Sequence, residues 1–304
     1  MLQLLCAPKK EAETIFNMFK RLRFLLIISC LSILVKAQAQ FDAPKSIELG
    51  PHGGMSYYIG DLNPAKHFAQ PSWQAGVVVR YNQSNRWVYR LDYTYANVQA
   101  SDEVIKWRPE RGLNFFSTIH DLSLMVEFNF LEYYTGNPKK NFSPYLFAGI
   151  SGFMFNPCRV TDSAMYELQP LQTEGESYSK FDVSIPFGFG FKMSLSKHIC
   201  ASLEWRLQKT FTDYLDDCGT VYPIEHAVLV KRDKGFVFDH VDPNEPYDGE
   251  GEIVFDYTDP TGKYKEAGMQ RGNSAYKDWF GIVGVSITWK FNLPDTRGCN
   301  LSKF

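Results

Sequence analysis

Three closely spaced aspartates are the first residues in this sequence whose type and spacing suggest chemistry. Asp213, Asp216 and Asp217 fall within the segment TDYLDD, and carboxylate oxygens this close together suit calcium. The spacing lacks the EF-hand pattern, and a solvated acidic loop is the simpler interpretation. These aspartates are therefore the candidates for a metal site, although we expect neither a bound metal nor a cofactor.

A surface protease would need a histidine beside those aspartates. His198 is expected at the opposite end of the fold, and His120, Asp121 and Ser123 are neighbours along one strand, which is not the geometry of a triad. The sequence contains no glycine-rich phosphate loop, no CxxC pair and no HExxH motif. We therefore expect that the protein is not an enzyme.

The cysteines are the second set of reactive residues. In a secreted chain, Cys158 and Cys218 would each follow a strand on the outer side, so a disulfide between them could tie two long loops together. Cys200 lies near the inner end of a predicted strand, and Cys299 lies in the tail after the last one. Either of these two could form an intermolecular disulfide; the alternatives are an inert thiol or a Cys200–Cys299 pair.

The N-terminal region has the three parts of a secretory signal peptide. A basic segment, KRLR, precedes an apolar run of twelve residues, and an Ala-Gln-Ala motif follows. We expect a signal peptide over residues 18–39, cleaved between Ala39 and Gln40, with residues 1–17 as an extension upstream of the true start. The alternative, a lipoprotein signal at Cys30, would leave the Ala-Gln-Ala motif without a role.

Beyond the signal, apolar and polar residues alternate in repeated segments of strand length. In WFGIVGVSITWKF (279–291) the odd positions are apolar or glycine, and from residue 284 the even positions are Gly, Ser, Thr and Lys. Aromatic residues make up 15% of the chain, yet the mean hydropathy is only −0.27. Polar lumen residues dilute the lipid-facing ones in this way in a transmembrane β-barrel. The net charge of −2 gives no reason to expect nucleic acid as a partner.

The pattern predicts an all-β fold, an eight-stranded antiparallel transmembrane β-barrel with long extracellular loops, over residues 40–291. The strands are expected near 46–59, 72–81, 86–96, 116–131, 143–155, 180–194, 198–210 and 279–291. Short connections alternate with long ones, so both termini are expected in the periplasm, with a periplasmic tail at 292–304. The longest outer loop, 211–278, should contain an extra hairpin formed by β-like pieces near 234–239 and 253–257.

A soluble sandwich or lipocalin-like barrel is the alternative, but it would place the apolar faces inside. The polar faces here hold a nearly balanced set of charges, which predicts ion pairs that fill the lumen and leave no wide pore. The predicted lumen charges are Glu48, Arg80, Arg90, Asp92, Asp121, Glu127, Asp182, Lys192, Glu204, Arg206 and Lys290.

Two further predictions concern aromatic residues. Gly188 and Gly190 should make room on the lumen side for bulky side chains opposite or permit the barrel to bend. Aromatic belts are expected at the two membrane interfaces. The belt residues would be Tyr57, Tyr58, Trp73, Trp87, Trp279 and Trp289.

Six segments together resemble the PorG-like outer-membrane family, over about residues 47 to 291. They are IELGPHGGMSYYIGDLNP (47–64), FSPYLFAGI (142–150), YELQPLQTEGE (166–176), IPFGFGFK (185–192), LEWRLQKTFTDYLDD (203–217) and RGNSAYKDWF (271–280). The loop around 218–270 is longer and more acidic than the family pattern.

The resemblance implies a non-catalytic outer-membrane subunit of the type IX (Por) protein secretion system, which supports gliding in some species. Its implied partners are other secretion-system subunits, outer-membrane lipid and a periplasmic ring formed by a lipoprotein and its partner, PorK and PorN. The ring would dock on 132–142 and 292–304, and Cys299 or Cys200 could link to the lipoprotein. The alternative is an autonomous surface barrel that acts through its extracellular loops in adhesion or ligand binding.

Overall fold

A computed structural model describes residues 45–161, 164–233, 235–247, 249–264 and 266–293. The expected signal peptide with its cleavage site at Ala39, and the tail with Cys299, lie outside the described residues. Within the described ranges, no helix combines the length and apolar character needed to cross a bilayer.

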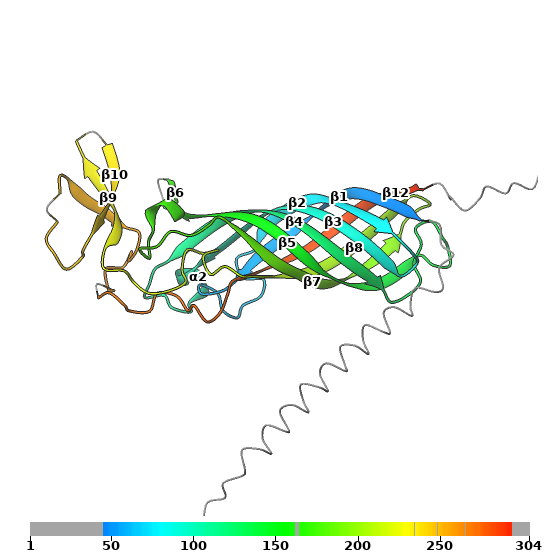
Figure 1. The fold of residues 1–304 in the computed structure, drawn as a ribbon, viewed down its shortest axis with the longest axis horizontal. Coiled ribbons are helices and arrows are strands. Elements are labelled where there is room, and N and C mark those ends of the chain that lie inside the picture. Colours follow the sequence, from blue (N-terminus) through cyan, green and yellow to red (C-terminus); the bar gives the residue numbers. More distant parts are fainter. Residues whose placement is uncertain (1–44, 162–163, 234, 248, 265, 294–304) are drawn as a thin grey trace, which may run out of the picture. The chain divides into compact units, whose positions relative to one another are not determined.

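Eight long strands form the wall of a closed barrel (Figure 1). They are β1 (Ser46–Ile59), β2 (Ser72–Asn82), β3 (Trp87–Ser101), β4 (Asn114–Asn129), β5 (Phe142–Val160), β7 (Phe181–Ser194), β8 (Ile199–Thr210) and β12 (Trp279–Asn292). Neighbours pair in the order β4-β3-β2-β1-β12-β8-β7-β5, and a β4–β5 pairing closes the ring. All eight pairings are antiparallel. The predicted eight-stranded antiparallel barrel is confirmed.

The two ends of the barrel differ in their connections. At the turn end, where Ser46 pairs with Asn292, the connections are the short turns 83–86 and 195–198 and the longer segment 130–141. At the loop end the connections are 60–71, 102–113, 161–180 and 211–278. β3, β4 and β5 have 15, 16 and 19 residues. A membrane-crossing strand needs only about 9–11 residues, so these strands extend beyond the bilayer at the loop end.

Inward and outward residues alternate along every wall strand because successive side chains point to opposite faces. In β12, Val285, Ile287 and Trp289 are exposed on the outer wall, whereas Ser286 and Thr288 are buried. Ten of the eleven predicted lumen charges are buried. The exception is the half-buried Asp182, which accepts a hydrogen bond from the Phe211 amide at the loop end. An apolar outer wall around a charged interior is the arrangement of an outer-membrane barrel.

The glycines of β7 make room for aromatic side chains, as predicted. A Cβ on Gly188 would lie 2.7 Å from the Phe147 ring, and one on Gly190 would lie 2.6 Å from the Tyr145 ring. Both rings belong to β5 and point into the lumen. The sequence left the facing of β5 open, and these two small neighbours explain how its aromatic residues fit inside.

Short strands and helical turns lie at the loop end (Figure 1). They are α2 (Asp102–Ile105), β6 (Met165–Glu167), the 3-10 turn η2 (Gln169–Leu171), β9 (His226–Arg232), β10 (Gly235–Val241) and β11 (Glu252–Asp256). The extra hairpin predicted in the last loop is a three-stranded sheet of order β10-β9-β11. Its central strand, β9, was not predicted. The sheet is anchored through Leu229 and Tyr257, which join a buried apolar core that includes barrel residues such as Phe155.

The belt prediction is wrong for Tyr57 and Tyr58, which are both 0% exposed. Tyr58 faces inward. Tyr57 is covered by the connection after β1, whose Phe68 ring centroid lies 4.8 Å from that of Tyr57, and the Trp205 indole N–H donates to the Tyr57 hydroxyl at 2.8 Å. The alternation pattern could not show that a loop folds back over the wall. Trp73, at 58% exposure, lies on the outer wall as predicted.

Candidate functional site

A buried network of ion pairs fills the middle of the barrel. The Arg90 guanidinium donates to both Glu204 oxygens, at 2.6 and 2.8 Å, and to Asp92 at 2.6 Å. Glu127 accepts from Arg80 at 3.0 Å and from Lys192 at 2.8 Å. These residues come from β2, β3, β4, β7 and β8, which lie on different sides of the ring.

The network connects across the lumen because each long cation reaches a carboxylate on another strand. Arg206 of β8 donates to Asp92 of β3 at 3.1 Å, and the Tyr145 hydroxyl of β5 donates to Glu204 at 3.0 Å. Paired in this way, the charges compensate one another's loss of water. Ion pairs packed between facing walls occupy the space that a conducting pore would need, as the balanced charges predict.

The turn end of the barrel is closed by residues 132–141 of the connection between β4 and β5, which we call the turn-end plug. The Thr135 hydroxyl donates to Glu48 at 2.6 Å, and the Thr135 carbonyl accepts from the Lys290 ammonium. Glu48 lies on β1 and Lys290 on β12. In the ring of eight, β1 and β12 lie opposite β4 and β5. The plug therefore spans the mouth of the barrel.

Two further hydrogen bonds and one close backbone approach fix the plug. The Tyr133 amide donates to the Asn85 carbonyl at 3.0 Å, in the turn after β2. The Gly136 amide donates to the Ser194 hydroxyl at 2.7 Å, at the end of β7. Gly136 has φ +90°, and a Cβ there would lie 2.5 Å from the Lys197 carbonyl oxygen. Only glycine suits both this φ and this close approach, so a side chain at residue 136 would force the plug to shift.

At the loop end, buried carboxyls surround the inward-facing Tyr58. Its hydroxyl oxygen lies 2.6 Å from an Asp216 oxygen and 2.7 Å from an Asp278 oxygen. A hydroxyl carries one proton, so one of these short contacts needs a proton held by a carboxyl. Burial, together with the Coulomb repulsion of the neighbouring aspartates, raises the pKa of Asp216 well above its usual range, and burial also raises that of Asp278.

The three aspartates that were candidates for a metal site do not converge. Asp216 contacts Tyr58, whereas Asp217 accepts from the Tyr178 hydroxyl at 2.6 Å, and Asp213 lies 3.5 Å from the Lys277 ammonium. Within the described part of the chain, no group of three or more acidic, histidine or cysteine side chains could hold a metal ion. Burial raises the pKa of Asp213 to about 6, and Lys277 opposes that shift.

The structure does not contain the predicted disulfide between Cys158 and Cys218, because both are free, buried thiols. Their thiols have separate neighbours. Cys218 donates to the Arg271 carbonyl at 3.3 Å, and Cys158 donates to the Asn156 carbonyl at 3.6 Å. Cys200 is also a free thiol, buried on the lumen side.

Sequence reasoning missed a second network, in which Glu174 and Arg271 hold the loops together. The Glu174 carboxylate accepts from the amides of Gly219 and Thr220 at 3.0 and 2.9 Å, and from Arg271 at 2.9 Å. Arg111 donates to the Arg271 carbonyl at 2.7 Å. Glu174 and Arg271 lie in segments that carry the family resemblance. That resemblance was the only signal in the sequence that could have found them. Neither lies in an alternating strand.

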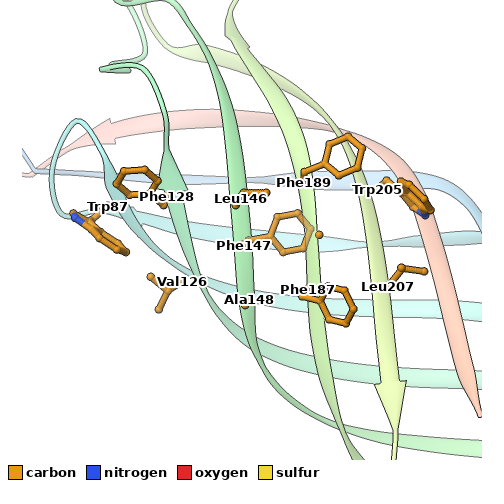
Figure 2. Close-up of a pocket in the computed structure, with 11 residues that line it drawn as sticks. Trp87, Val126, Phe128, Leu146, Phe147, Ala148, Phe187, Phe189, Trp205 and Leu207 are labelled. Carbon is orange, nitrogen blue, oxygen red and sulfur yellow. The ribbon is translucent and has the colours of Figure 1, made fainter. Parts of the chain in front are cut away.

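The outer wall carries an apolar depression of about 550 Å³ over β5 and β7. In Figure 2, Trp87 and Phe128 flank one side, Phe189 and Trp205 the other, and Ala148 lies between them. The lining residues include no titratable group. The depression is therefore part of the lipid-facing surface and has no group that could perform acid–base chemistry.

Comparisons with solved structures find outer-membrane barrels. OprG from Pseudomonas aeruginosa is 13% identical, with a TM-score of 0.39 and coverage of 83% of this chain and 97% of that one. Neisserial surface protein A is 9% identical, with a TM-score of 0.37 and coverage of 82% and 98%. A major outer membrane protein from Thermus thermophilus is 11% identical, with a TM-score of 0.38 and coverage of 82% and 100%.

No curated protein matches the chain. One family model, described as a domain of unknown function, DUF6089, matches residues 21–229. The match covers more than half of the sequence. The chain therefore belongs to the DUF6089 family.

Proposed function

We propose that this protein is a non-catalytic outer-membrane subunit of the type IX secretion system. In this proposal its turn end faces the periplasm and couples the ring of a PorK-like lipoprotein and its PorN-like partner to the membrane. The six family-like segments support the secretion role. The turn-end plug is the structural observation that carries the proposal, because it offers a fixed surface on the side where a ring would dock.

A filled barrel has to act through its surfaces. The lumen holds a buried ion-pair network, so transport through this barrel is not the expected role. The plug is tied to β1, β7 and β12, and a surface held in this way loses little freedom when a partner binds. Its outer residues Glu132 and Lys140 form an exposed ion pair at 2.6 Å, which leaves a polar rim suited to a water-filled periplasm.

The test is gentle detergent extraction of the tagged, full-length protein, followed by identification of the chains that co-purify. We expect a periplasmic lipoprotein of the ring among them. Non-reducing gels of wild type and Cys299→Ser then show whether the link is covalent, since the covalent form predicts a heavier band that the substitution removes. Purification of the barrel alone, without any ring subunit, would contradict the proposal.

The second candidate is an autonomous surface barrel, and one observation favours it. The loop-end sheet exposes Phe236, Phe238 and Val254 on β10 and β11. Exposed apolar side chains on a small sheet can form an adhesion or ligand-binding surface. Removal of residues 233–251 distinguishes the two roles. If the barrel acts autonomously, the deletion should abolish adhesion or ligand binding and leave ring association unchanged. If the barrel is a secretion subunit, both secretion and ring association should persist.

A further inference from the structure

A cavity of about 710 Å³ opens at the loop end beside the outer wall. Its lining comes from the chain after β1, the segment after α2, the segment before β12 and the end of β8. Trp279 and Lys209, which pair across β12 and β8, line the cavity at the loop-end edge of the barrel wall. Trp279 is the first residue of the apolar row of β12, so this edge marks the boundary of the lipid-facing band.

Positive charge dominates the lining. It contains Arg108, Arg111, Lys209 and Lys277 against a single carboxylate, Asp61. Arg111 is committed to Asp102, to which it donates at 2.6 and 3.0 Å. The Asp61 carboxylate accepts from the Asn273 amide at 2.7 Å.

The other three cations are less tightly held. Lys277 is 41% exposed and lies 3.5 Å from Asp213, and Arg108 lies 3.5 Å from the exposed Glu110. The Lys209 ammonium lies 5.7 Å from the centre of the Trp279 ring. Among the described residues, no carboxylate lies within ion-pairing distance of Lys209. Lys277, Arg108 and Lys209 are therefore solvent-accessible cations that line one cavity. Their ion-pair partners are weak or, for Lys209, absent among the described residues.

Aromatic side chains complete the site. Trp107 is 60% exposed and Tyr276 is 73% exposed, and both line the cavity together with Trp279. Exposed Trp and Tyr have an apolar body and a polar tip, which suits the interface between lipid and water. Flat rings beside cations can contact a sugar face while the cations pair with phosphate oxygens.

We propose that this cavity binds the phosphorylated sugar headgroup of a glycolipid in the outer leaflet. Its position at the lipid boundary favours a membrane lipid over a soluble molecule, and its charge favours a phosphate. The proposal requires that the loop end lies on the outer side of the membrane. It does not depend on the secretion role, so failure of either leaves the other standing.

The experiment uses the full-length barrel in detergent and measures lipid binding by native mass spectrometry. The probes are a bisphosphorylated glucosamine lipid (lipid A), the same lipid without phosphates, and inorganic phosphate. We expect lipid A to bind about tenfold more tightly than its dephosphorylated form, the scale of one lost charge-assisted contact.

The test variant is Lys209→Gln/Lys277→Gln, which removes two exposed ammonium groups at the cavity. The control is Lys139→Gln, which makes one such exchange at an exposed position on the turn-end plug. We expect the double variant to weaken lipid A binding about tenfold or more, and the control to bind as the wild type does.

Circular dichroism of both variants reports whether the barrel is folded, and Arg108→Gln is the second variant if the double one is not. Equal binding of lipid A to wild type and variant, or equal binding of the two lipids, would overturn the proposal. Displacement of lipid A by equimolar inorganic phosphate would also overturn it, because the site would then be one for free phosphate.

Discussion

The lumen network and the loop-end cluster both bury charged side chains, but they balance that charge differently. In the central lumen network, Arg90 faces the carboxylates of Asp92 and Glu204, and the charged side chains of this network pair with ones of opposite sign. At the loop end, Asp216 and Asp278 meet at a tyrosine hydroxyl, and burial favours a proton on the pair. Ion pairs compensate the buried charge in the lumen, whereas a proton held by a carboxyl compensates it at Tyr58. The neighbouring loops also contain the buried Glu174–Arg271 ion pair.

Breaking one ion pair in the lumen should have the largest effect. Arg90→Met leaves Glu204 and Asp92 buried with one cationic partner fewer, and we expect a loss of about 3–5 kcal/mol in the free energy of unfolding. Urea unfolding of the barrel in lipid vesicles measures it. The matched control, Arg232→Met, removes an exposed arginine whose partner Asp239 is also exposed. A loss below about 1 kcal/mol for Arg90→Met would show that the pairing contributes little.

Removing the hydroxyl at the loop end should have an intermediate effect. Tyr58→Phe leaves the Asp216 and Asp278 carboxyls without their shared partner, which we expect to cost about 1–3 kcal/mol. The cost should appear locally, as faster amide hydrogen exchange over residues 212–220. Exchange in the turn-end plug serves as the internal control, and acceleration in both places would indicate global destabilisation instead.

The pH dependence of the loop end should be smaller and has a defined sign. The folded state raises the pKa of Asp213 from 3.8 to about 6, so the folded state binds the proton more tightly than the unfolded state. The stabilisation is complete below the unfolded pKa and is lost as the pH rises through about 6. We expect exchange over 211–220, corrected for its intrinsic pH dependence, to be a few-fold faster at about pH 8 than at about pH 5. Asp213→Asn should reduce this pH dependence. Slower exchange at the higher pH in the wild type would contradict the prediction.

The smallest effect is expected for the cysteines. Cys158 and Cys218 are free thiols with separate neighbours. Their serine variants should therefore migrate like wild type on non-reducing gels. A mobility change that appears only without reductant would show that the two thiols form a disulfide after all.

The two regions also differ in how far the sequence predicts them. Strand alternation predicted the eight wall strands, the facing of Arg80, Arg90 and Glu127, and the space beside Gly188, because a period of two fixes which side chains meet in the lumen. The loop-end contacts have no such period. Glu174 and Arg271 are 97 residues apart in the sequence, and only the closure of the barrel brings their loops together.

Loops also explain the wrong predictions. Tyr57 follows the pattern of a lipid-facing residue, yet the chain around Phe68 folds over it. The pair Cys158 and Cys218 was suggested by the side of the barrel on which each lies, and side alone does not set the distance between two thiols. β9 was missed although β10 and β11 of the same loop were predicted, and its buried run from His226 to Val230 does not alternate between two faces.

Site-specific photo-cross-linking in cells tests the proposed docking surface most directly. A photoreactive residue at Lys139 lies on the exposed surface of the turn-end plug, and one at Glu245 lies on the exposed surface of the loop end. The proposed function predicts a cross-link from position 139 to the periplasmic ring lipoprotein and none from position 245. A cross-link to that lipoprotein from 245 only, or from neither position in cells that assemble the ring, would contradict it.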